Sequence, residues 1–401
     1  MNAPGDNAQS HEPSPGPAAS LGEVAGCYLR LGMTAFGGPA AHLALMRSEL
    51  VVRRSWVSEQ ELLDLIGGAS LLPGPTSTEV ALMLARRRKG WAALIIGGVC
   101  FISPSMLLVL ALSWAYVRYG TTDPGAGVLF GVKPVVVAII ANAVVGLART
   151  AARRWLLGLV AAAALSAYFL GVSPVLILLG AALIVTLFEN RDRWTQAVPG
   201  ASSAAAPFLI TRLHLAGRTG TGSSRLARAA LPAVFLEFLK VGSIVFGSGY
   251  VLVSYLHGDL VLGNHWLTES QLLATVAIGQ VTPGPVFTTA TAIGYVVGGL
   301  PGALLATVAI FLPSFVLVAA FMPLLSRARR SKWSASALDG VNAGAVALMA
   351  GVTVQLGRAS LIDWLSALVC LVSLGLLWRW RMNAAWLVLA GAGVGLLRMF
   401  A

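Results

Sequence analysis

The feature that most constrains this chain is a succession of long apolar segments. Roughly a dozen stretches of about 20 largely apolar residues are separated by short polar or basic connections, and each stretch is long enough to cross a bilayer. Of the 401 residues, 57% are hydrophobic and only 11% are charged, which excludes an ordinary soluble domain. We therefore expect an all-α polytopic membrane protein that has the lipid bilayer as its solvent.

The second feature is an internal repeat. A shift of 210 positions aligns Pro73-Gly74-Pro75 with Pro283-Gly284-Pro285, and a shift of 209 aligns Pro104-Ser105 with Pro313-Ser314. An alignment of the chain with itself that keeps one register for so long indicates that the chain consists of two homologous halves. The repeat predicts a disordered tail at 1–20, an N-terminal repeat at 21–188, a basic linker at 189–230 and a C-terminal repeat at 231–401.

The positions of Lys and Arg predict the orientation of each half, because cytoplasmic loops retain positive charge. In the first half, basic clusters flank the Pro-Gly-Pro segment on both sides, whereas the loops 257–265 and 298–300 of the second half contain no Lys or Arg. A segment with both ends on one face is most simply a re-entrant hairpin. We expect two inverted repeats in the bacterial inner membrane, each with about five transmembrane helices plus a re-entrant Pro-Gly-Pro hairpin.

This topology places the linker in the cytoplasm and both termini in the periplasm. An alternative stays open in which the Pro-Gly-Pro segments cross fully as kinked helices. Each half then has six crossings and the repeats are parallel, which disagrees with the charge pattern. Inverted repeats with broken helices are typical of secondary transporters, which bind substrate near the midplane.

The Pro-Gly-Pro triplets are the first candidate substrate site. Pro and Gly interrupt a helix, and the freed polar groups need partners inside the protein or in a wet cavity. The helix that follows presents N–H groups and a positive dipole end, which suit a tetrahedral oxyanion. The alternative is that the triplets only kink packed helices. The predicted substrate-binding residues here are Pro73, Gly74, Pro75, Thr76, Ser77, Thr78, Pro283, Gly284, Pro285, Thr288 and Thr289.

Basic residues inside apolar segments are the second candidate. Arg30 and Lys240 occupy aligned positions in the first apolar segments, about 22–46 and 231–256. Charges at such depth usually face a cavity, so two inverted copies would bring two cations towards a pseudo-two-fold axis. The alternative is that both side chains snorkel to the interface. Lys133, beside Pro134, is a third possible anion ligand.

A small-residue segment and two titratable side chains complete the predicted site. Phe36, Gly37, Gly38 and Pro39 follow Arg30 and permit close helix contact or exposure of backbone to a ligand. Glu79 lies four residues after Pro75 and could exchange protons during transport, because burial raises the pKa of a carboxyl group. It could equally pair with nearby arginines. His42 is a weaker candidate for the same role.

Other function classes find little support in the sequence. The net charge of +12 lies in short clusters beside apolar segments, which indicates topology rather than binding of nucleic acid. The three cysteines form no C-x-x-C pair, and neither H-E-x-x-H nor G-x-S-x-G occurs. We predict no cofactor, no metal and no catalytic residue, and a membrane-embedded enzyme is the weaker alternative.

The runs 31–42, 56–59 and 72–75, with their echoes in the second half, resemble the chromate ion transporter family in its long, two-domain form. This resemblance implies an antiporter that exports chromate with the proton motive force and confers chromate resistance. Short, single-domain relatives pair in opposite orientations, which the resemblance implies is the ancestor of the inverted repeat. A possible homodimer is a further expectation. A transporter of sulfate or another tetrahedral oxyanion is the alternative, and the coupling stoichiometry, direction of flux and oligomeric state stay open. The resemblance marks Phe36, Gly37, Gly38, Pro39, Pro73, Gly74 and Pro75 as signature positions.

Overall fold

The computed structural model describes residues 20–35, 38–151, 154–191, 231–246, 251–322, 332–380 and 382–398. Within these ranges the chain is helical, apart from turns and one isolated β-bridge between Pro73 and Phe246. The described helices of the first half are α1 (Leu21–Thr34), α2 (Pro39–Met46), η1 (Arg47–Arg53), α3 (Glu59–Ala69), α4 (Thr76–Tyr119), α5 (Asp123–Ala151), α6 (Trp155–Phe169) and α7 (Pro174–Glu189).

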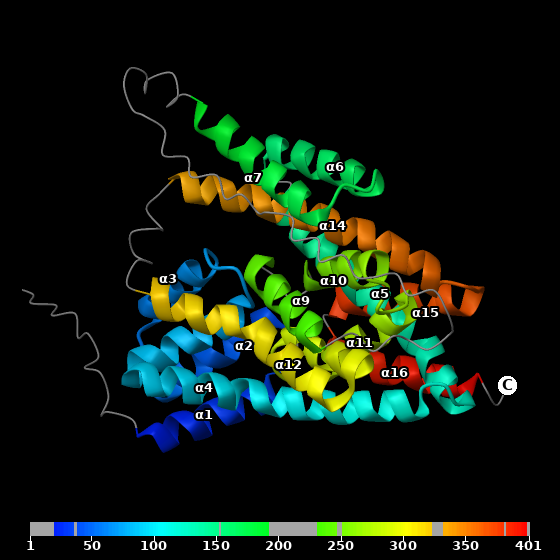
Figure 1. The fold of residues 1–401 in the computed structure, drawn as a ribbon, viewed down its shortest axis with the longest axis horizontal. Coiled ribbons are helices and arrows are strands. Elements are labelled where there is room, and N and C mark those ends of the chain that lie inside the picture. The colour runs from blue at the N-terminus through cyan, green and yellow to red at the C-terminus, as the bar shows by residue number, and fades with distance from the viewer. Residues whose placement is uncertain are drawn as a thin grey trace, which may run out of the picture.

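The second half repeats this order (Figure 1). Its described helices are α9 (Leu231–Ile244), α10 (Val251–Leu256), η2 (His257–Gly263), α11 (Glu269–Val281), η3 (Val286–Thr288), α12 (Thr289–Phe321), α14 (Lys332–Ser360), α15 (Trp364–Trp380) and α16 (Ala384–Leu397).

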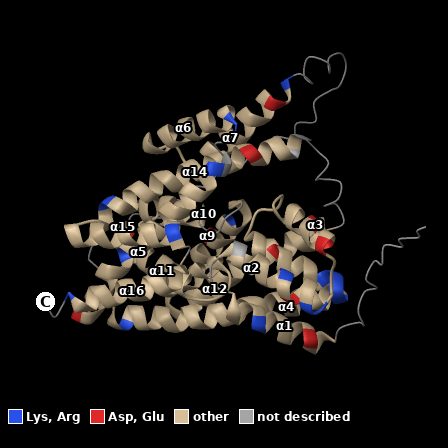
Figure 2. Ribbon diagram, turned by 180° about the vertical axis from the view of Figure 1, so that it is seen from behind, with Lys and Arg blue, Asp and Glu red and all other residues tan. Residues whose placement is uncertain are grey.

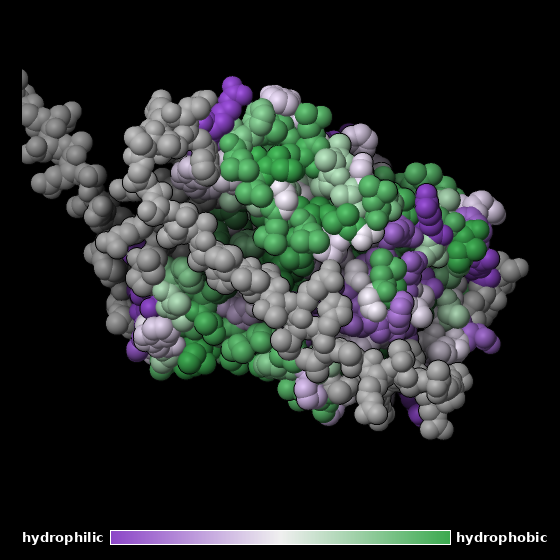
Figure 3. All heavy atoms as spheres, turned by 45° about the horizontal axis from the view of Figure 1, so that its top comes forward, coloured by the Kyte–Doolittle hydropathy of each residue, from purple (hydrophilic) through white to green (hydrophobic). Residues whose placement is uncertain are grey.

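Four of the described helices are long and apolar enough to cross a bilayer. They cover Thr76–Tyr119, Asp123–Arg149, Val286–Phe321 and Ala335–Ser360, and shorter apolar helices accompany them. Large apolar side chains are exposed on their outer faces, and Figure 3 shows broad hydrophobic areas on the surface. Such a surface suits lipid rather than water. The predicted all-α polytopic membrane fold is therefore confirmed at this level.

Helix α4 consists of two antiparallel arms. The backbone leaves helical geometry at Lys89 and Gly90, where Gly90 has φ +69°. A Cβ atom built on Gly97 would lie 2.9 Å from the Cβ of Ala85, so the chain has folded back on itself. Helix α12 does the same at Gly299, and the Thr291 and Thr307 hydroxyls on its two arms lie 2.7 Å apart.

The Pro-Gly-Pro segment of the first half forms the tip of a second hairpin. Glu61 at the start of α3 pairs with Arg87 at the end of the first arm of α4, at 2.9 Å. The Arg88 guanidinium lies over the Trp56 ring. 

The centroid of that ring lies 5.2 Å from Cζ of Arg88 and 5.1 Å from Cζ of Arg54. Both ends of the segment therefore lie together, as in a hairpin and unlike a kinked crossing.

The same hairpin recurs in the second half. There the tip is Pro283-Gly284-Pro285, and a Cβ atom on Gly279 of α11 would meet the Thr289 side chain at the start of α12. Each hairpin begins with a capping box, in which Ser58 or Thr268 caps the first turn.

The first apolar segment of each half differs from the expected single crossing. The helix stops at Thr34 and restarts at Pro39, and in the second half it stops at Ile244. In that half, Lys240 of α9 pairs with Asp259 of η2 at 2.9 Å, so the chain turns back between them. The prediction that each of the segments 22–46 and 231–256 crosses the membrane as one continuous helix is therefore wrong. Gly38, with φ +80°, and Pro39 account for the break, because neither conformation continues a helix.

The hairpins of the two halves point in opposite directions along the molecule. Arg86, at the base of the first-half hairpin, donates to the carbonyls of Val318 and Ala319 at the end of α12. The opposite end of this second arm of α12 lies near Gly298. A Cβ atom on Gly298 would lie 3.4 Å from Leu231 at the start of α9. We call the end that contains Arg86 the basic end and the opposite one the far end. Figure 2 shows blue segments of the ribbon concentrated near α3 and α4.

The remaining helices exchange partners between the halves. Helix α5 packs on α16 and α15, and the equivalent α14 packs on α7 and α6. Gly131 of α5 approaches the Gly391 carbonyl so closely that a Cβ atom there would overlap it, and Gly340 of α14 meets Ala181 of α7 in the same way. Small residues at these four positions let the backbones touch.

The ion pairs at the two ends also match. Arg154 of α6 pairs with Glu189 of α7 at 2.6 Å at the basic end, and Arg398 pairs with Asp363 at 2.7 Å at the far end. Asp363 lies in the turn before α15, where the Ser366 N–H and the Arg398 guanidinium hold its pKa below the ordinary value. The two pairs stand 209 positions apart with their charges exchanged.

Two predicted segments lie outside the described residues. They are the tail, apart from Ser20, and nearly all of the linker 189–230. The described residues that flank the linker are Glu189 at the basic end and Leu231 at the far end.

We predict that Gly131→Leu lowers the thermal unfolding temperature of the purified protein. The new side chain would overlap the α16 backbone, and overpacking of this kind costs about 1–3 kcal/mol. Gly146→Leu on the same helix is the matched control, because a Cβ atom there meets nothing within 4 Å. Equal unfolding temperatures for both variants in detergent would contradict the packing described here.

Candidate functional site

The tips of the hairpins meet in the interior of the molecule. The Gly74 N–H donates to the Val245 carbonyl at 2.7 Å, and the Gly284 N–H donates to the Ala35 carbonyl at 2.9 Å. Gly74 and Gly284 stand 210 positions apart, as do Ala35 and Val245. Each Pro-Gly-Pro break is therefore hydrogen-bonded to the break of the opposite half.

His42 joins the two tips into one polar network. Its Nε2 lies 3.1 Å from the Ala35 carbonyl, which also accepts from Gly284, and its Nδ1 lies 3.1 Å from the Ser77 hydroxyl. A carbonyl can only accept, so Nε2 carries the proton and the neutral ring accepts from Ser77 through Nδ1. His42 is buried and both ring nitrogens are engaged, which gives it a positioning role in this state.

Glu79 lies in the first turn of α4, directly beside the Gly74 tip. Its side chain is 0% exposed, its Oε1 lies 3.5 Å from the Ser314 hydroxyl, and its Oε2 has no hydrogen-bond partner among the described residues. No described cation pairs with it. An unpaired carboxylate anion at such a place is costly, whereas a neutral carboxylic acid is tolerated.

The opposite tip carries hydroxyl groups where the first one carries the carboxyl group. Ser105 lies 2.8 Å from the Thr288 hydroxyl, and a Cβ atom on Gly284 would lie 2.7 Å from that of Ser105. Thr288 also donates to the Pro285 carbonyl, and Thr289 donates to Val286. Thr289 stands at the position of Glu79, so only one of the two tips contains a titratable group.

Helices begin at these tips and direct their positive dipole ends inward. Helix α4 starts at Thr76, directly after its Pro-Gly-Pro break, α12 starts at Thr289, after the short 3₁₀ helix η3, and α2 starts at Pro39. Two buried polar atoms nearby, Oγ1 of Thr78 and Nε2 of Gln280, have no hydrogen-bond partner in the described part of the chain. Buried donors without a partner are uncommon, and they are suited to an additional polar ligand. We call the residues His42, Ser77, Thr78, Glu79, Ser105, Gln280, Thr288, Thr289 and Ser314 the tip cluster.

The structure does not bring Arg30 and Lys240 together. Both residues are exposed on the outside of α1 and α9. Lys240 forms ion pairs with Glu237 at 2.6 Å and Asp259 at 2.9 Å, which neutralise it locally. The predicted pair of cations around a shared cavity is therefore not found, because the periodicity of α1 and α9 turns these positions away from the tip cluster.

Lys133 is the predicted cation that remains within the bundle. It lies on α5, ten residues after the helix begins at the far end, and is half-buried. No hydrogen bond or ion pair joins its ammonium group to another described residue. A half-buried cation at this depth is costly unless it serves an anion.

The other predicted positions divide into two groups. Gly38 and Pro39 form the turn into α2, and Thr76 begins α4, so these residues shape a tip. Phe36 and Gly37 lie outside the described residues. No group of three or more His, Cys, Asp or Glu side chains that could hold a metal ion occurs among the residues searched.

Sequence reasoning missed three members of the tip cluster, Ser105, Ser314 and Gln280. The two serines follow aligned prolines, so the repeat carried a signal that could have identified them. Gln280 gives no such signal, because its aligned position is Ser70.

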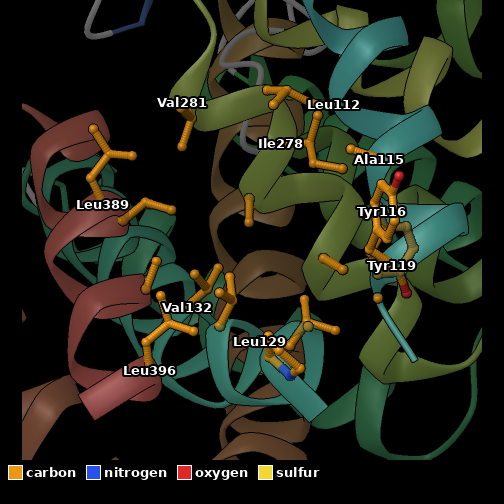
Figure 4. A pocket seen from close by; sticks show the side chains of 18 of the residues that line it. Leu112, Ala115, Tyr116, Tyr119, Leu129, Val132, Ile278, Val281, Leu389 and Leu396 are labelled. Carbon is orange, nitrogen blue, oxygen red and sulfur yellow. The ribbon is translucent and has the colours of Figure 1, made fainter. Parts of the chain in front are cut away.

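A separate cavity of about 610 Å³ lies between the end of α4 and helices α5, α11 and α16 (Figure 4). Its walls are apolar side chains such as Leu112, Val132, Ile278 and Leu389, together with the rings of Tyr116 and Tyr119. An oxyanion would lose its hydration there without gaining donors. This cavity is therefore not the candidate anion site.

Comparisons with known proteins follow the two halves. A family model described as "Chromate transporter" matches residues 22–186 and 232–396. The chromate transport protein of Cupriavidus metallidurans is 31% identical, covering 94% of this chain and 93% of the relative. The probable chromate transport protein of Synechococcus elongatus is 33% identical, covering 90% and 91%. The chromate transport protein of Pseudomonas aeruginosa is 30% identical, covering 94% and 92%. No solved structure matches.

We predict that Gly74→Ala abolishes chromate transport while Gly90→Ala preserves it. Both glycines have positive φ, so both variants carry backbone strain of about 1–2 kcal/mol. Only at Gly74 would the new methyl group also collide with Glu79 and Ser314, whereas at Gly90 it meets nothing within 4 Å. Chromate accumulation in cells that express each variant at equal levels measures the difference. Wild-type transport by Gly74→Ala would remove this tip from the site.

Proposed function

Because the chain belongs to the chromate transporter family, we propose that it exports chromate from the cytoplasm in exchange for protons, using the tip cluster as its substrate site. The single observation that carries this proposal is a fully buried, unpaired Glu79 at the point where the helix breaks of both halves meet. The family is one of transporters, which leaves the alternative of a membrane-embedded enzyme without support.

The two halves act as inverted repeats in this proposal. The opposite directions of their hairpins and the exchanged pairs α5–α16 and α14–α7 support this arrangement. The basic end faces the cytoplasm of the bacterial inner membrane, since it carries Arg86, Arg87, Arg88 and Lys89. The far end then faces the periplasm.

The proposed topology differs from the one expected from sequence. Each half contributes two re-entrant hairpins and four crossings, because its first apolar segment turns back. The start of α1 then lies on the cytoplasmic side rather than in the periplasm, and the end of α16 stays periplasmic. Glu189 would then face the cytoplasm and Leu231 the periplasm.

Oxyanion binding at the tip cluster rests on dipoles and hydroxyl groups rather than on a pair of cations. The N-termini of α4 and α12 favour negative charge, and Thr78 and Gln280 offer free donors. Lys133 would add the attracting charge from α5. This chemistry serves chromate and sulfate alike, so sulfate transport is the alternative, and the names of the relatives favour chromate.

Glu79 supplies the proposed coupling. Exchange requires that the protein reorients with either chromate or a proton bound, but not with both. Glu79 takes up a proton on the periplasmic side after chromate has left, carries it inward while the site is empty, and releases it to the cytoplasm before the next chromate binds. Thr289 at the equivalent position cannot titrate, so one carboxyl group serves both tips. Chromate resistance would follow from export, and the homodimer stays a prediction.

The direction of flux is tested with everted membrane vesicles. With an acidic interior, vesicles that contain the protein should accumulate radiolabelled chromate, and collapse of the pH gradient should stop this accumulation. Unlabelled sulfate in excess tests the alternative substrate. Chromate uptake that is independent of the pH gradient would contradict the exchange of chromate for protons.

We predict that Glu79→Gln loses gradient-driven accumulation but keeps exchange of labelled for unlabelled chromate. The amide has the shape of the neutral acid and cannot release a proton. Glu61→Gln is the matched control, because this exposed carboxylate of the same hairpin pairs with Arg87 and glutamine keeps its cap. Full gradient-driven transport by Glu79→Gln would exclude Glu79 as the proton carrier.

We predict that Lys133→Gln raises the KM for chromate about tenfold, equivalent to about 1.4 kcal/mol of lost attraction, and that Lys133→Arg preserves it. Arg30→Gln is the comparison, since its exposed side chain should leave the KM unchanged. A raised KM for Arg30→Gln together with an unchanged KM for Lys133→Gln would instead support the anion site predicted from sequence at Arg30 and Lys240.

A further inference from the structure

Equivalent faces of the two hairpins are buried to very different extents. Leu273 on α11 is 1% exposed, whereas Leu63 at the same position of α3 is 52% exposed. Ala274 is buried on α11, but its counterpart Asp64 is exposed. The same side of the hairpin is therefore covered in the second half and open in the first.

The surface that should cover α3 is also open. Val388 of α16, which shares the cavity wall with Ala277 of α11, is 4% exposed. Its equivalent on α7 is Leu179, which is 55% exposed. Both sides of one potential interface are thus exposed, while both sides of its equivalent are buried.

The packing of whole helices agrees with these side chains. Helix α11 packs on α5, α16 and α14, whereas α3 packs on α4 and η1 and makes at most marginal contact with α7 or α14. In Figure 1, α7 and α14 diverge from α3 at the left, which is the basic end, and approach the rest of the bundle towards the right.

We infer that the face of α3 containing Leu63, Asp64 and Gly67 is an interaction surface whose partner is α7 with α14 of the same chain. Closure of this surface would seal the basic end, and the equivalent α11–α16 interface would then open the far end. This inference rests on the proposed function, because exchange of the two interfaces presents the tip cluster first to one face of the membrane and then to the other.

The repeat makes the two states similar in free energy. Closure buries Leu63 and Leu179, and opening exposes Leu273 and Val388, so the apolar area gained on one side offsets the area lost on the other. Inverted repeats can exchange conformations in this way. A small difference in free energy allows ligand or proton binding to shift the populations.

Cysteine cross-linking tests the inference directly. In a chain with Cys27, Cys100 and Cys370 replaced by alanine, one variant carries Gly67→Cys with Leu179→Cys. A second carries the equivalent pair, Ala277→Cys with Val388→Cys. We expect a flexible bis-maleimide reagent to cross-link either pair, each with loss of transport. Absence of any cross-link in the first pair, or cross-linking that leaves transport intact, would overturn the inference.

Solvent accessibility gives a second readout that needs no substrate. With an impermeant maleimide, Leu63→Cys should react at least about tenfold faster than Leu273→Cys in everted vesicles. Cross-linking of the first pair should expose Leu273→Cys to reagent from the periplasmic face. If Leu63→Cys does not react with the impermeant maleimide, the α3 face contacts lipid and the inference is wrong. If both pairs cross-link and the accessibility changes occur while chromate does not move, the proposed substrate is wrong and the inference stands.

Discussion

The structure depends on one constraint, the need of every backbone polar group in a bilayer for a partner inside the protein. The helix breaks free N–H and carbonyl groups at a depth where no lipid can bind them. Gly74 and Gly284 donate to carbonyls at the breaks of the opposite half, Val245 and Ala35. Neither half can satisfy its own break, so the halves are joined at the place where each is irregular.

This pairing also explains the chemistry gathered at the centre. Helices that start at a tip bring their N–H groups and positive dipole ends with them, and hydroxyl side chains surround them without adding charge. Glu79 is the exception, because a carboxyl group replaces the threonine of the other tip. A site with dipoles and one carboxyl group can respond to a proton without holding a permanent counter-charge.

Symmetry in sequence and asymmetry in packing belong together in this molecule. The same helix–helix contacts recur after a shift of 209 or 210 positions, as at Gly131 on Gly391 and Gly340 on Ala181. The α3 and α11 faces nonetheless differ in burial, since a single conformation cannot close both ends around one central site. The α3 and α11 faces, where the two halves depart from symmetry, are therefore the place where we propose that the conformational change occurs.

The sequence by itself determined the membrane class, the repeat, the two Pro-Gly-Pro breaks and the end that carries positive charge. These properties depend on local composition, on the Pro and Gly residues that break helices, and on charge near the segment ends. Only the tertiary structure decided that Gly38 and Pro39 lie at a turn rather than inside a crossing, that Lys240 is paired with Asp259, and that Ser105, Ser314 and Gln280 join Glu79. Those facts depend on which helix faces which, and contacts between residues some 200 positions apart leave no local pattern to read.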